Sequence, residues 1–387
     1  MESNELLTRR VAKILPSSLE LSSLMSRRKI RLYQGFDPTG GHLHLGHTIG
    51  LRKLMEFARA GHEVIFLFGT GTVLVGDPSE RDTGRKLITQ EEIEANISDW
   101  KRQVSPIVDF DLVTIRQNGD WLTKMKLKDI IEVASKISSV QLFKRASFTR
   151  RINKGETVWY HETMYPLLQG YDSVVMDVDL EIGGTDQEFN MLVGRELQRK
   201  MNDREKYVLT TPMILGTDGK TMSKTSGNCI FLDESPLDMY GKLMAVRDEL
   251  IPTYFELLTD MEMSEIASLD PREPLANKKA LALRITSELH GQTKALEAQK
   301  AFSLTVQGGQ APEDAPSVKL ASGKQTVRHI LKSASLGVSN AQLKRTVEDG
   351  GVEIGGVKIL EIDKEIEVKP GSILKFGKRN FRKLEID

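Results

Sequence analysis

The stretch IRLYQGF at residues 30–36, followed by HLGH at residues 44–47, decides the fold that this sequence predicts. The first segment is strand-like, and a turn containing Pro38 and two glycines separates it from the second. HLGH opens a run with helical periodicity over 45–60. A strand that leads through a turn into a helix N-terminus is typical of α/β domains that bind phosphate groups.

The same alternation continues to about residue 215. Further strand-like runs are predicted at 62–69, 110–115 and near 180–183, and helical runs at 45–60, 91–105, 126–137 and 161–173. Short strands alternating with helices indicate a parallel sheet with crossover helices. The predicted fold class is therefore α/β, with a Rossmann-like catalytic domain.

Two further regions differ in pattern from this domain. Residues 233–304 show continuous helical periodicity, and the Gly-, Pro- and Ala-rich segment that follows has the composition of a linker. The tail contains two short helical segments, a glycine hairpin and a basic end, which predicts a small α+β domain. The predicted domains are 1–228, 229–304 (helical), 305–322 (linker) and 323–387.

Composition excludes several classes of protein. The chain has 387 residues, of which 39% are hydrophobic and 28% charged, as in an ordinary soluble globular protein. No apolar run approaches the length of a membrane span, and the single cysteine, Cys229, fits a reducing cytoplasm. Residues 323–387 carry a net charge of +4 while the rest carries −4, which indicates nucleic-acid contacts at one end.

Two segments suit a nucleoside triphosphate. His44 and His47 are three apart at a predicted helix N-terminus, where N–H groups and a partial positive charge favour phosphate oxygens. Lys224 lies in the loop TMSKT at 221–225, between Gly219 and Gly227, where a mobile ammonium could contact the outer phosphates. Taken alone, a His-x-x-His pair is more often two surface residues at a helix cap; the DPT turn at 37–39 and the matching lysine loop reverse that preference.

A third and a fourth segment suit other parts of a ligand. GGTDQ at 183–187 follows a predicted strand end, where Asp186 could accept ribose hydroxyls. Tyr165, Gln169 and Asp172 share one face of an otherwise apolar helix. Those polar groups could either meet solvent or bind a polar ligand, and the pattern alone does not separate the two readings.

These motifs resemble a known family. HLGH and TMSKT resemble the HIGH and KMSKS signatures of class I aminoacyl-tRNA synthetases. YQGFDPT at 33–39, GDPS at 76–79, GGTDQ and the Tyr-x-x-x-Gln-x-x-Asp helix together resemble the bacterial tyrosyl-tRNA synthetases over essentially the whole chain, and the tail resembles the αL RNA-binding fold. One departure is Thr221, which stands where the second signature has its first lysine; Lys220 lies one position earlier.

The resemblance implies a reaction and a set of site residues. The enzyme would activate tyrosine with ATP, accompanied by Mg²⁺, and transfer the tyrosyl group to tRNA(Tyr). Tyr33 and Asp172 would meet the substrate phenol, Asp77, Tyr165 and Gln169 its ammonium group, and Gln187 its carboxylate. The implied catalytic residues are Thr39, His44, His47, Arg81, Arg85 and Lys224.

The remaining implied residues contact the nucleotide and the RNA. The nucleotide set is Gly35, Asp37, Gly46, Gly183, Gly184, Asp186, Met222 and Ser223, and the RNA set is Lys344, Arg345, Lys375, Lys378, Arg379 and Arg382. The resemblance also implies a homodimer. We expect no protein side chain to bind a metal ion, and we expect no membrane or DNA partner.

Three alternatives stay open at this point. A tryptophanyl-tRNA synthetase shares both signatures, a small-molecule adenylyltransferase shares the histidine pair, and a non-catalytic RNA-binding protein could keep the fold as a scaffold. Asp172 and Tyr33 favour a phenol over an indole, because a site that hydrogen-bonds a hydroxyl leaves its own polar groups unpaired when the hydroxyl is absent.

Overall fold

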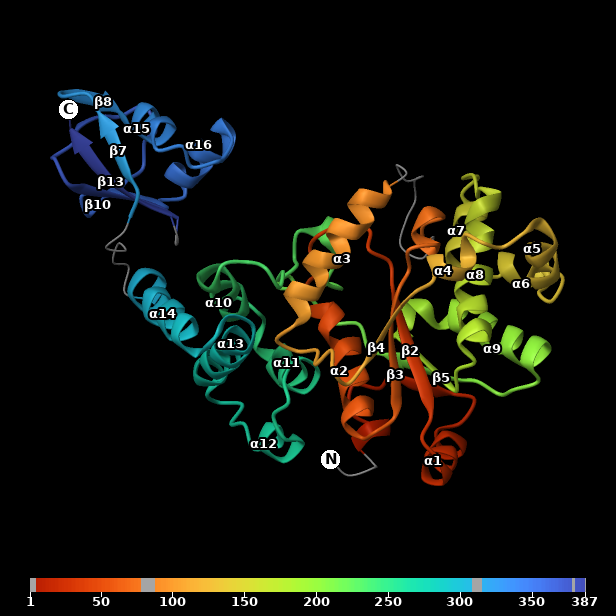
Figure 1. Cartoon of the computed structure of the whole chain (residues 1–387). Coiled ribbons are helices and arrows are strands. Elements are labelled where there is room, and N and C mark those ends of the chain that lie inside the picture. Colours follow the sequence, from red (N-terminus) through yellow and green to blue (C-terminus); the bar gives the residue numbers. More distant parts are fainter. Residues whose placement is uncertain (1–4, 78–87, 308–314, 378–379, 387) are drawn as a thin grey trace. The chain divides into compact units, whose positions relative to one another are not determined.

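The computed structural model describes residues 5–77, 88–307, 315–377 and 380–386 (Figure 1). By compactness the chain divides into two units, residues 1–235 with 242–289, and residues 236–241 with 290–387. The segment predicted as a helical domain contributes to both units, and the domain bounds from the sequence stay a prediction. Along the described chain, no helix is both long and apolar enough to cross a membrane.

A six-stranded sheet forms the centre of the first unit. Its strand order is β1-β6-β5-β2-β3-β4, and every neighbouring pair is parallel except β1 with β6. The strands are β1 (Lys13–Leu15), β2 (Arg31–Phe36), β3 (Glu63–Phe68), β4 (Thr114–Gln117), β5 (Leu180–Gly184) and β6 (Tyr207–Thr211). The predicted parallel α/β fold is confirmed, and β1 and β6 are strands that the sequence reading did not name.

The helices of this unit follow the predicted alternation. Figure 1 shows α2 and α3 on one side of the strands and α8 and α9 on the other. The bounds are α1 (Ser18–Arg27), α2 (Leu45–Arg59), α3 (Gln90–Val104), α4 (Gly119–Leu122), α5 (Leu127–Ala134), α6 (Ser139–Phe143), α7 (Ala146–Asn153), α8 (Tyr160–Met176) and α9 (Glu188–Asn202).

One predicted strand is displaced. The sequence reading placed it at 110–115, whereas β4 begins at Thr114. The side chain of Asp109 accepts a hydrogen bond from the backbone N–H of Asp111 at 3.0 Å, which is an Asx turn. Residues 109–111 thus form a turn, and the strand begins only after it.

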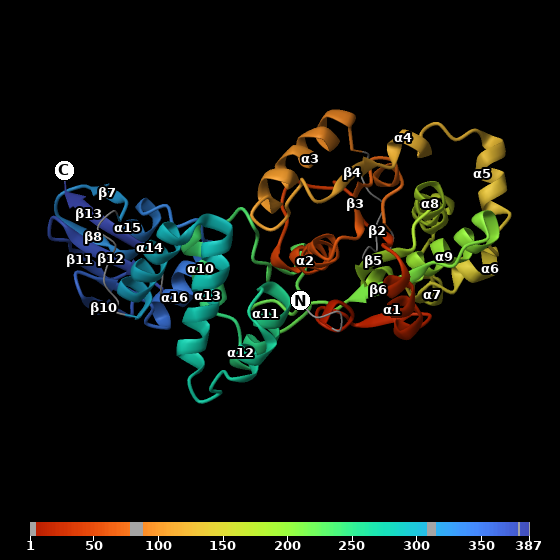
Figure 2. The same ribbon diagram turned by 60° about the horizontal axis from the view of Figure 1, so that its bottom comes forward.

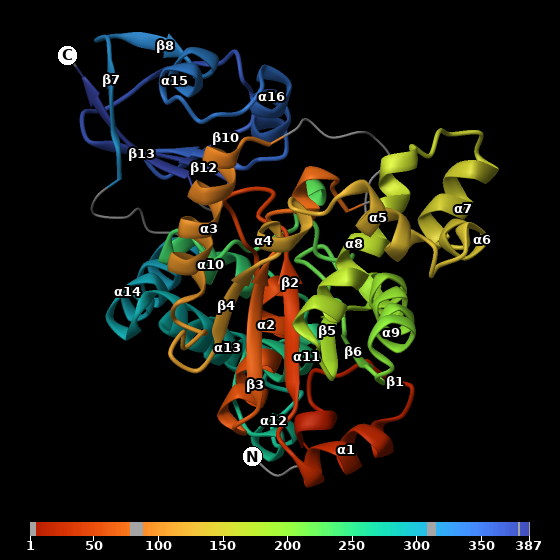
Figure 3. The ribbon, with the colours of Figure 1, turned by 45° about the vertical axis from the view of Figure 1, so that its right-hand side comes forward.

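Helices α8 and α9 cross at two glycines. A Cβ added at Gly170 of α8 would lie 3.0 Å from the backbone nitrogen of Gly194 of α9. Both glycines therefore let the two backbones approach closely, and Figure 3 shows the two helices side by side next to β5. This close crossing brings α8, β5 and β6 together behind the site described below.

The segment after β6 is helical. Its helices are α10 (Pro236–Met244), α11 (Ile251–Leu258), α12 (Met263–Ala267), α13 (Pro274–His290) and α14 (Gln292–Phe302). Figure 2 shows α11 and α12 side by side. Arg9 and Arg10, near the N-terminus, donate to the carbonyl of Thr259 just after α11, which ties the start of the chain to this segment.

The C-terminal residues form a five-stranded sheet of order β10-β9-β12-β13-β7 and a separate pair, β11 with β8. Helices α15 (Val327–Ser333) and α16 (Asn340–Glu348) contribute to the same hydrophobic core. The strands are β7 (Ser317–Leu320), β8 (Lys324–Thr326), β9 (Val352–Ile354), β10 (Val357–Ile359), β11 (Glu365–Glu367), β12 (Ser372–Phe376) and β13 (Asn380–Ile386). The sheet thus takes in β7, which lies within the segment predicted as a linker.

Candidate functional site

Two adjoining hollows of about 280 and 420 Å³ open at the carboxyl ends of β2, β3 and β5. Open parallel sheets bind ligands at this edge. Every candidate ligand-site residue that the structure describes outside the C-terminal unit lines one hollow or both. The residues common to the two are Gln34, Phe36, Thr39, His47, Gly184, Asp186, Gln187 and Lys224.

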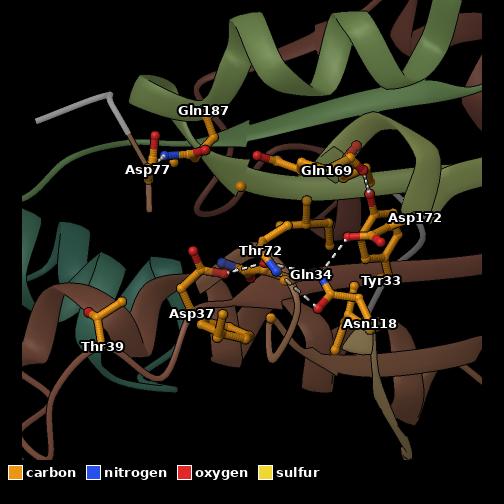
Figure 4. A pocket seen from close by; sticks show the side chains of 18 of the residues that line it. Tyr33, Gln34, Asp37, Thr39, Thr72, Asp77, Asn118, Gln169, Asp172 and Gln187 are labelled. Carbon is orange, nitrogen blue, oxygen red and sulfur yellow. Dashed lines mark hydrogen bonds between the residues drawn. The ribbon is translucent and has the colours of Figure 1, made fainter. Parts of the chain in front are cut away.

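The smaller hollow ends at Tyr33 and Asp172, which lie together in Figure 4. Both carboxylate oxygens of Asp172 accept N–H bonds, from Trp121 at 2.8 Å and from Asn118 at 3.0 Å. Burial raises the pKa of Asp172, while these two hydrogen bonds oppose the shift. Burial also raises the pKa of Tyr33, so its hydroxyl keeps its proton at neutral pH. This end of the hollow therefore offers one hydroxyl and one carboxyl group.

Asp77 and Gln187 lie at the other end of the same hollow (Figure 4). The amide of Gln187 donates to Asp77 at 2.7 Å, and Arg145 donates to the second oxygen of Asp77 at 3.1 Å. Asn190 joins Gln187 to Gln169, because its amide donates to both side-chain oxygens at 2.9 Å. The polar groups of this end are thus held in one connected network.

Asp37, the residue after strand β2, is hydrogen-bonded to the segment after β3 and to helix α8. It accepts from Thr72 at 2.7 Å and from the hydroxyl of Tyr165 at 3.0 Å. Burial, with the charge of Asp37 second, raises the pKa of Tyr165. A Cβ at Gly69 would lie 1.9 Å from the same carboxylate, so a glycine is needed there. Asp37 therefore holds Tyr165 in place as well as lining the hollow.

The two histidines of HLGH cap helix α2. His44 is the N-cap residue, and its Nδ1 accepts from the backbone N–H of Gly46 at 3.2 Å. Its proton consequently sits on Nε2. The Nδ1 of His47 accepts from the backbone N–H of His44 at 3.1 Å, which completes a capping box.

Both imidazoles are neutral at neutral pH. Burial, with the charge of Lys224 second, lowers the pKa of His44 to about 4. Burial also lowers the pKa of His47, and the neighbouring His44 adds to that shift. The rings, 4.0 Å apart between centroids, can therefore act as neutral N–H donors toward an anion.

The TMSKT loop lines the larger hollow through Met222, Ser223 and Lys224. Asn228 holds the loop: its Oδ1 accepts from the Ser223 N–H at 3.0 Å, and its Nδ2 donates to the Thr221 carbonyl at 3.1 Å. Neither Lys220 nor Thr221 is among the lining residues of either hollow, and Lys220 is exposed. In this structure Lys220, one position before Thr221, thus lies outside both hollows.

Some predicted residues lie elsewhere. Arg81, Arg85, Lys378 and Arg379 fall outside the described residues. Lys344 and Arg345 are exposed on α16, whereas Lys375 lies 3.9 Å from Glu353 and Arg382 is half-buried against the Ala334 carbonyl. Within the described ranges, no group of three or more His, Cys, Asp or Glu side chains could hold a metal ion.

Sequence reading missed several residues that shape the site. Asn118 directly follows β4, and the rule that parallel strands present ligand groups at their carboxyl ends could have found it. Gln34, next to Tyr33, lines both hollows, and its Oε1 is buried without a hydrogen-bond partner. Glu181 is a lone charge in an otherwise apolar strand, which is a signal in itself.

The chain is similar to several known proteins. Residues 25–307 match the family model of the class I tRNA synthetases (W and Y). A tyrosine–tRNA ligase of Dehalococcoides mccartyi is 39% identical over 98% of both chains, and one of Bordetella avium is 40% identical over 92% of this chain and 88% of that protein. A tyrosyl-tRNA synthetase from Archaeoglobus fulgidus, solved with L-tyrosine, has a similar fold: its TM-score is 0.62 at 22% identity, over 77% of this chain and 99% of that one.

Proposed function

The chain belongs to the tyrosyl-tRNA synthetase family of class I tRNA synthetases, and we propose from this premise how its residues carry out the reaction. It is a tyrosine–tRNA ligase, which activates tyrosine with ATP to tyrosyl-adenylate and transfers the tyrosyl group to tRNA. The tryptophanyl alternative is not favoured. The roles of single residues, given next, are our proposal.

Tyrosine binds with its phenol at the closed end of the smaller hollow. The supporting observation is the polar pair there: the hydroxyl of Tyr33 beside Asp172, whose two oxygens are fixed by Asn118 and Trp121. Phenylalanine would leave the Tyr33 hydroxyl and the Asp172 carboxylate without a hydrogen-bond partner from the substrate, which is costly enough in a buried site to separate the two amino acids. The ammonium group binds near Asp77, Tyr165 and Gln169, and the carboxylate near Gln187.

ATP occupies the larger hollow, between the α2 N-terminus and the TMSKT loop. The tyrosine carboxylate is already ionised and needs no general base, so catalysis consists of positioning and charge stabilisation. His44 and His47 donate N–H bonds to phosphate oxygens as neutral imidazoles, with Thr39 beside them, and Lys224 supplies a positive charge. Arg81 and Arg85 keep their predicted role at pyrophosphate.

The nucleoside half of ATP contacts small residues. Glycines 35, 46, 183 and 184 let the backbone approach it, and Asp186 accepts from the ribose. Mg²⁺ accompanies ATP through the phosphates and water, which suits its preference for oxygen ligands. We further propose a cytoplasmic homodimer whose C-terminal domain binds tRNA(Tyr) through the basic side chains predicted above.

The test is ATP–pyrophosphate exchange with tyrosine, phenylalanine and tryptophan offered separately. Exchange that depends on tyrosine alone supports the proposed pocket. Exchange with tryptophan would overturn the assignment of Tyr33 and Asp172 to a phenol. No exchange from folded protein with any of the three would overturn the proposed site as a whole.

A further inference from the structure

A buried lysine lies behind the tyrosine pocket and has no part in the reaction described so far. Lys206 directly precedes β6, is fully buried and forms an ion pair with Glu181 of β5, which is 1% exposed. A buried ion pair is weak evidence for stability, because desolvating two charges offsets most of their attraction. Its place beside the pocket suggests a different use.

Lys206 contacts the pocket through Ser173 of α8. The Nζ of Lys206 lies 2.8 Å from the Ser173 Oγ, and this Oγ lies 2.9 Å from the hydroxyl oxygen of Tyr33. Glu181 lines the pocket and accepts from the Gln169 amide at 3.0 Å. The lysine and its partner thus support both Tyr33 and Gln169 from behind.

The close crossing of α8 and α9 makes room for this lysine. A Cβ added at Gly194 would lie 2.5 Å from the Nζ of Lys206 and 3.0 Å from the Ser173 Oγ. The amine therefore occupies a slot that only a glycine leaves open.

The hydrogen-bond donors can be assigned in order. An ammonium group only donates, so the Ser173 Oγ accepts from Lys206. Ser173 then has one proton to give, and Tyr33 at 2.9 Å is a better acceptor than Glu181 at 3.4 Å. The Tyr33 hydroxyl can in turn donate to the Gln169 carbonyl, at 3.5 Å, which is too long for a good O–H bond, or toward the Glu181 carboxylate, whose oxygens already accept from other donors. A substrate oxygen at ordinary hydrogen-bond distance would therefore be the better acceptor for the Tyr33 proton.

We propose that Lys206 and Ser173 are positioning residues for amino-acid specificity: they orient the Tyr33 hydroxyl as a donor to the substrate phenol oxygen. Lys206 donates to Ser173, Ser173 to Tyr33, and Tyr33 to the phenol oxygen, while the phenol hydroxyl donates a hydrogen bond to the carboxylate of Asp172. Phenylalanine, which has no hydroxyl, loses both the bond from Tyr33 and the bond to Asp172. The inference rests on the proposed function, since it assumes that the phenol binds between Tyr33 and Asp172.

The experiment compares kcat/KM for tyrosine and phenylalanine in pyrophosphate exchange. In Ser173→Ala we expect a fall of about 2–10-fold in the ratio of the two, the usual effect of one neutral hydrogen bond. The change should appear as a higher KM for tyrosine, with the KM for ATP unaltered. The double variant Lys206→Met/Glu181→Gln removes the donor without leaving a buried charge unpaired, and it should lower the ratio similarly.

Lys53→Met is the matched control. Lys53 is also fully buried and pairs with Glu56, but it lines neither hollow. It should lower the melting temperature and leave the tyrosine-to-phenylalanine ratio at the wild-type value. A wild-type ratio in folded Ser173→Ala and in the double variant would overturn the inference while tyrosine-dependent exchange by the wild type still supported the proposed function. Absence of that exchange in the wild type would overturn both.

Discussion

Replacing Asp172 by asparagine keeps the shape of the side chain but changes what it can accept. In the wild type, one carboxylate oxygen of Asp172 accepts from the Asn118 amide and the other from the Trp121 indole N–H. An asparagine has one oxygen and one NH₂ group, so in either orientation its NH₂ faces a donor. Asn118 cannot flip to relieve this, because its Oδ1 accepts from the Gly71 N–H at 2.7 Å and its Nδ2 also donates to Thr72.

The loss for tyrosine comes from one hydrogen bond. A bond from the phenol to an ionised acceptor is worth about 1.5–3 kcal/mol. At 1.4 kcal/mol per factor of ten, Asp172→Asn should lower kcat/KM for tyrosine by about 10- to 10²-fold. The enzyme N–H left without an acceptor is present with either substrate, so it lowers stability and not selectivity. Phenylalanine has no hydroxyl to lose, so its value should stay within about threefold of wild type by the same reasoning.

The assay is pyrophosphate exchange with each amino acid, alongside circular dichroism to confirm that the variant is folded. The two substrates serve as controls for each other, because general damage to the site lowers both values together. A tyrosine value within about threefold of wild type, from folded protein, would refute the assignment of Asp172 to the phenol.

Three further predictions concern other parts of the chain. Lys224→Ala should lower the rate of adenylate formation by about 10²–10³-fold, as for loss of one transition-state donor, whereas Lys220→Ala should change single-turnover activation little; equal losses would contradict the loop assignment. The pKa of His44 is lowered to about 4, so between pH 6.5 and 4 the unfolded state binds the extra proton and stability falls as the pH falls. In His44→Asn, which can still cap the helix, the melting temperature should depend less on pH across that window. An unchanged dependence of melting temperature on pH would argue against a buried neutral imidazole. Deleting residues 315–387, a cut placed before β7, should spare pyrophosphate exchange and weaken tRNA charging; full charging would refute the RNA-binding role.

The parts of this fold that the sequence predicted are those that local patterns encode. The bounds of strand β2 and of helix α2 agree with the predicted bounds to within one residue, because a strand-like run, a turn and two capping histidines follow one another there. β6 and β1 were not named. β1 has three residues, and its antiparallel pairing with β6 spans almost two hundred residues, which no local pattern reveals.

The site follows the same division between local and long-range information. Helical spacing indicated Tyr165, Gln169 and Asp172, and the same rule extends to Ser173, four residues after Gln169 on the same helix. Lys206 gives no such signal: in the sequence it stands among charged residues before a strand, which usually means a solvated turn. It is buried because β6 pairs with β5 and because Gly170 and Gly194 bring α8 and α9 together. The residues that would contact tyrosine are therefore readable from motifs, whereas those that would orient them depend on strand order and helix crossing.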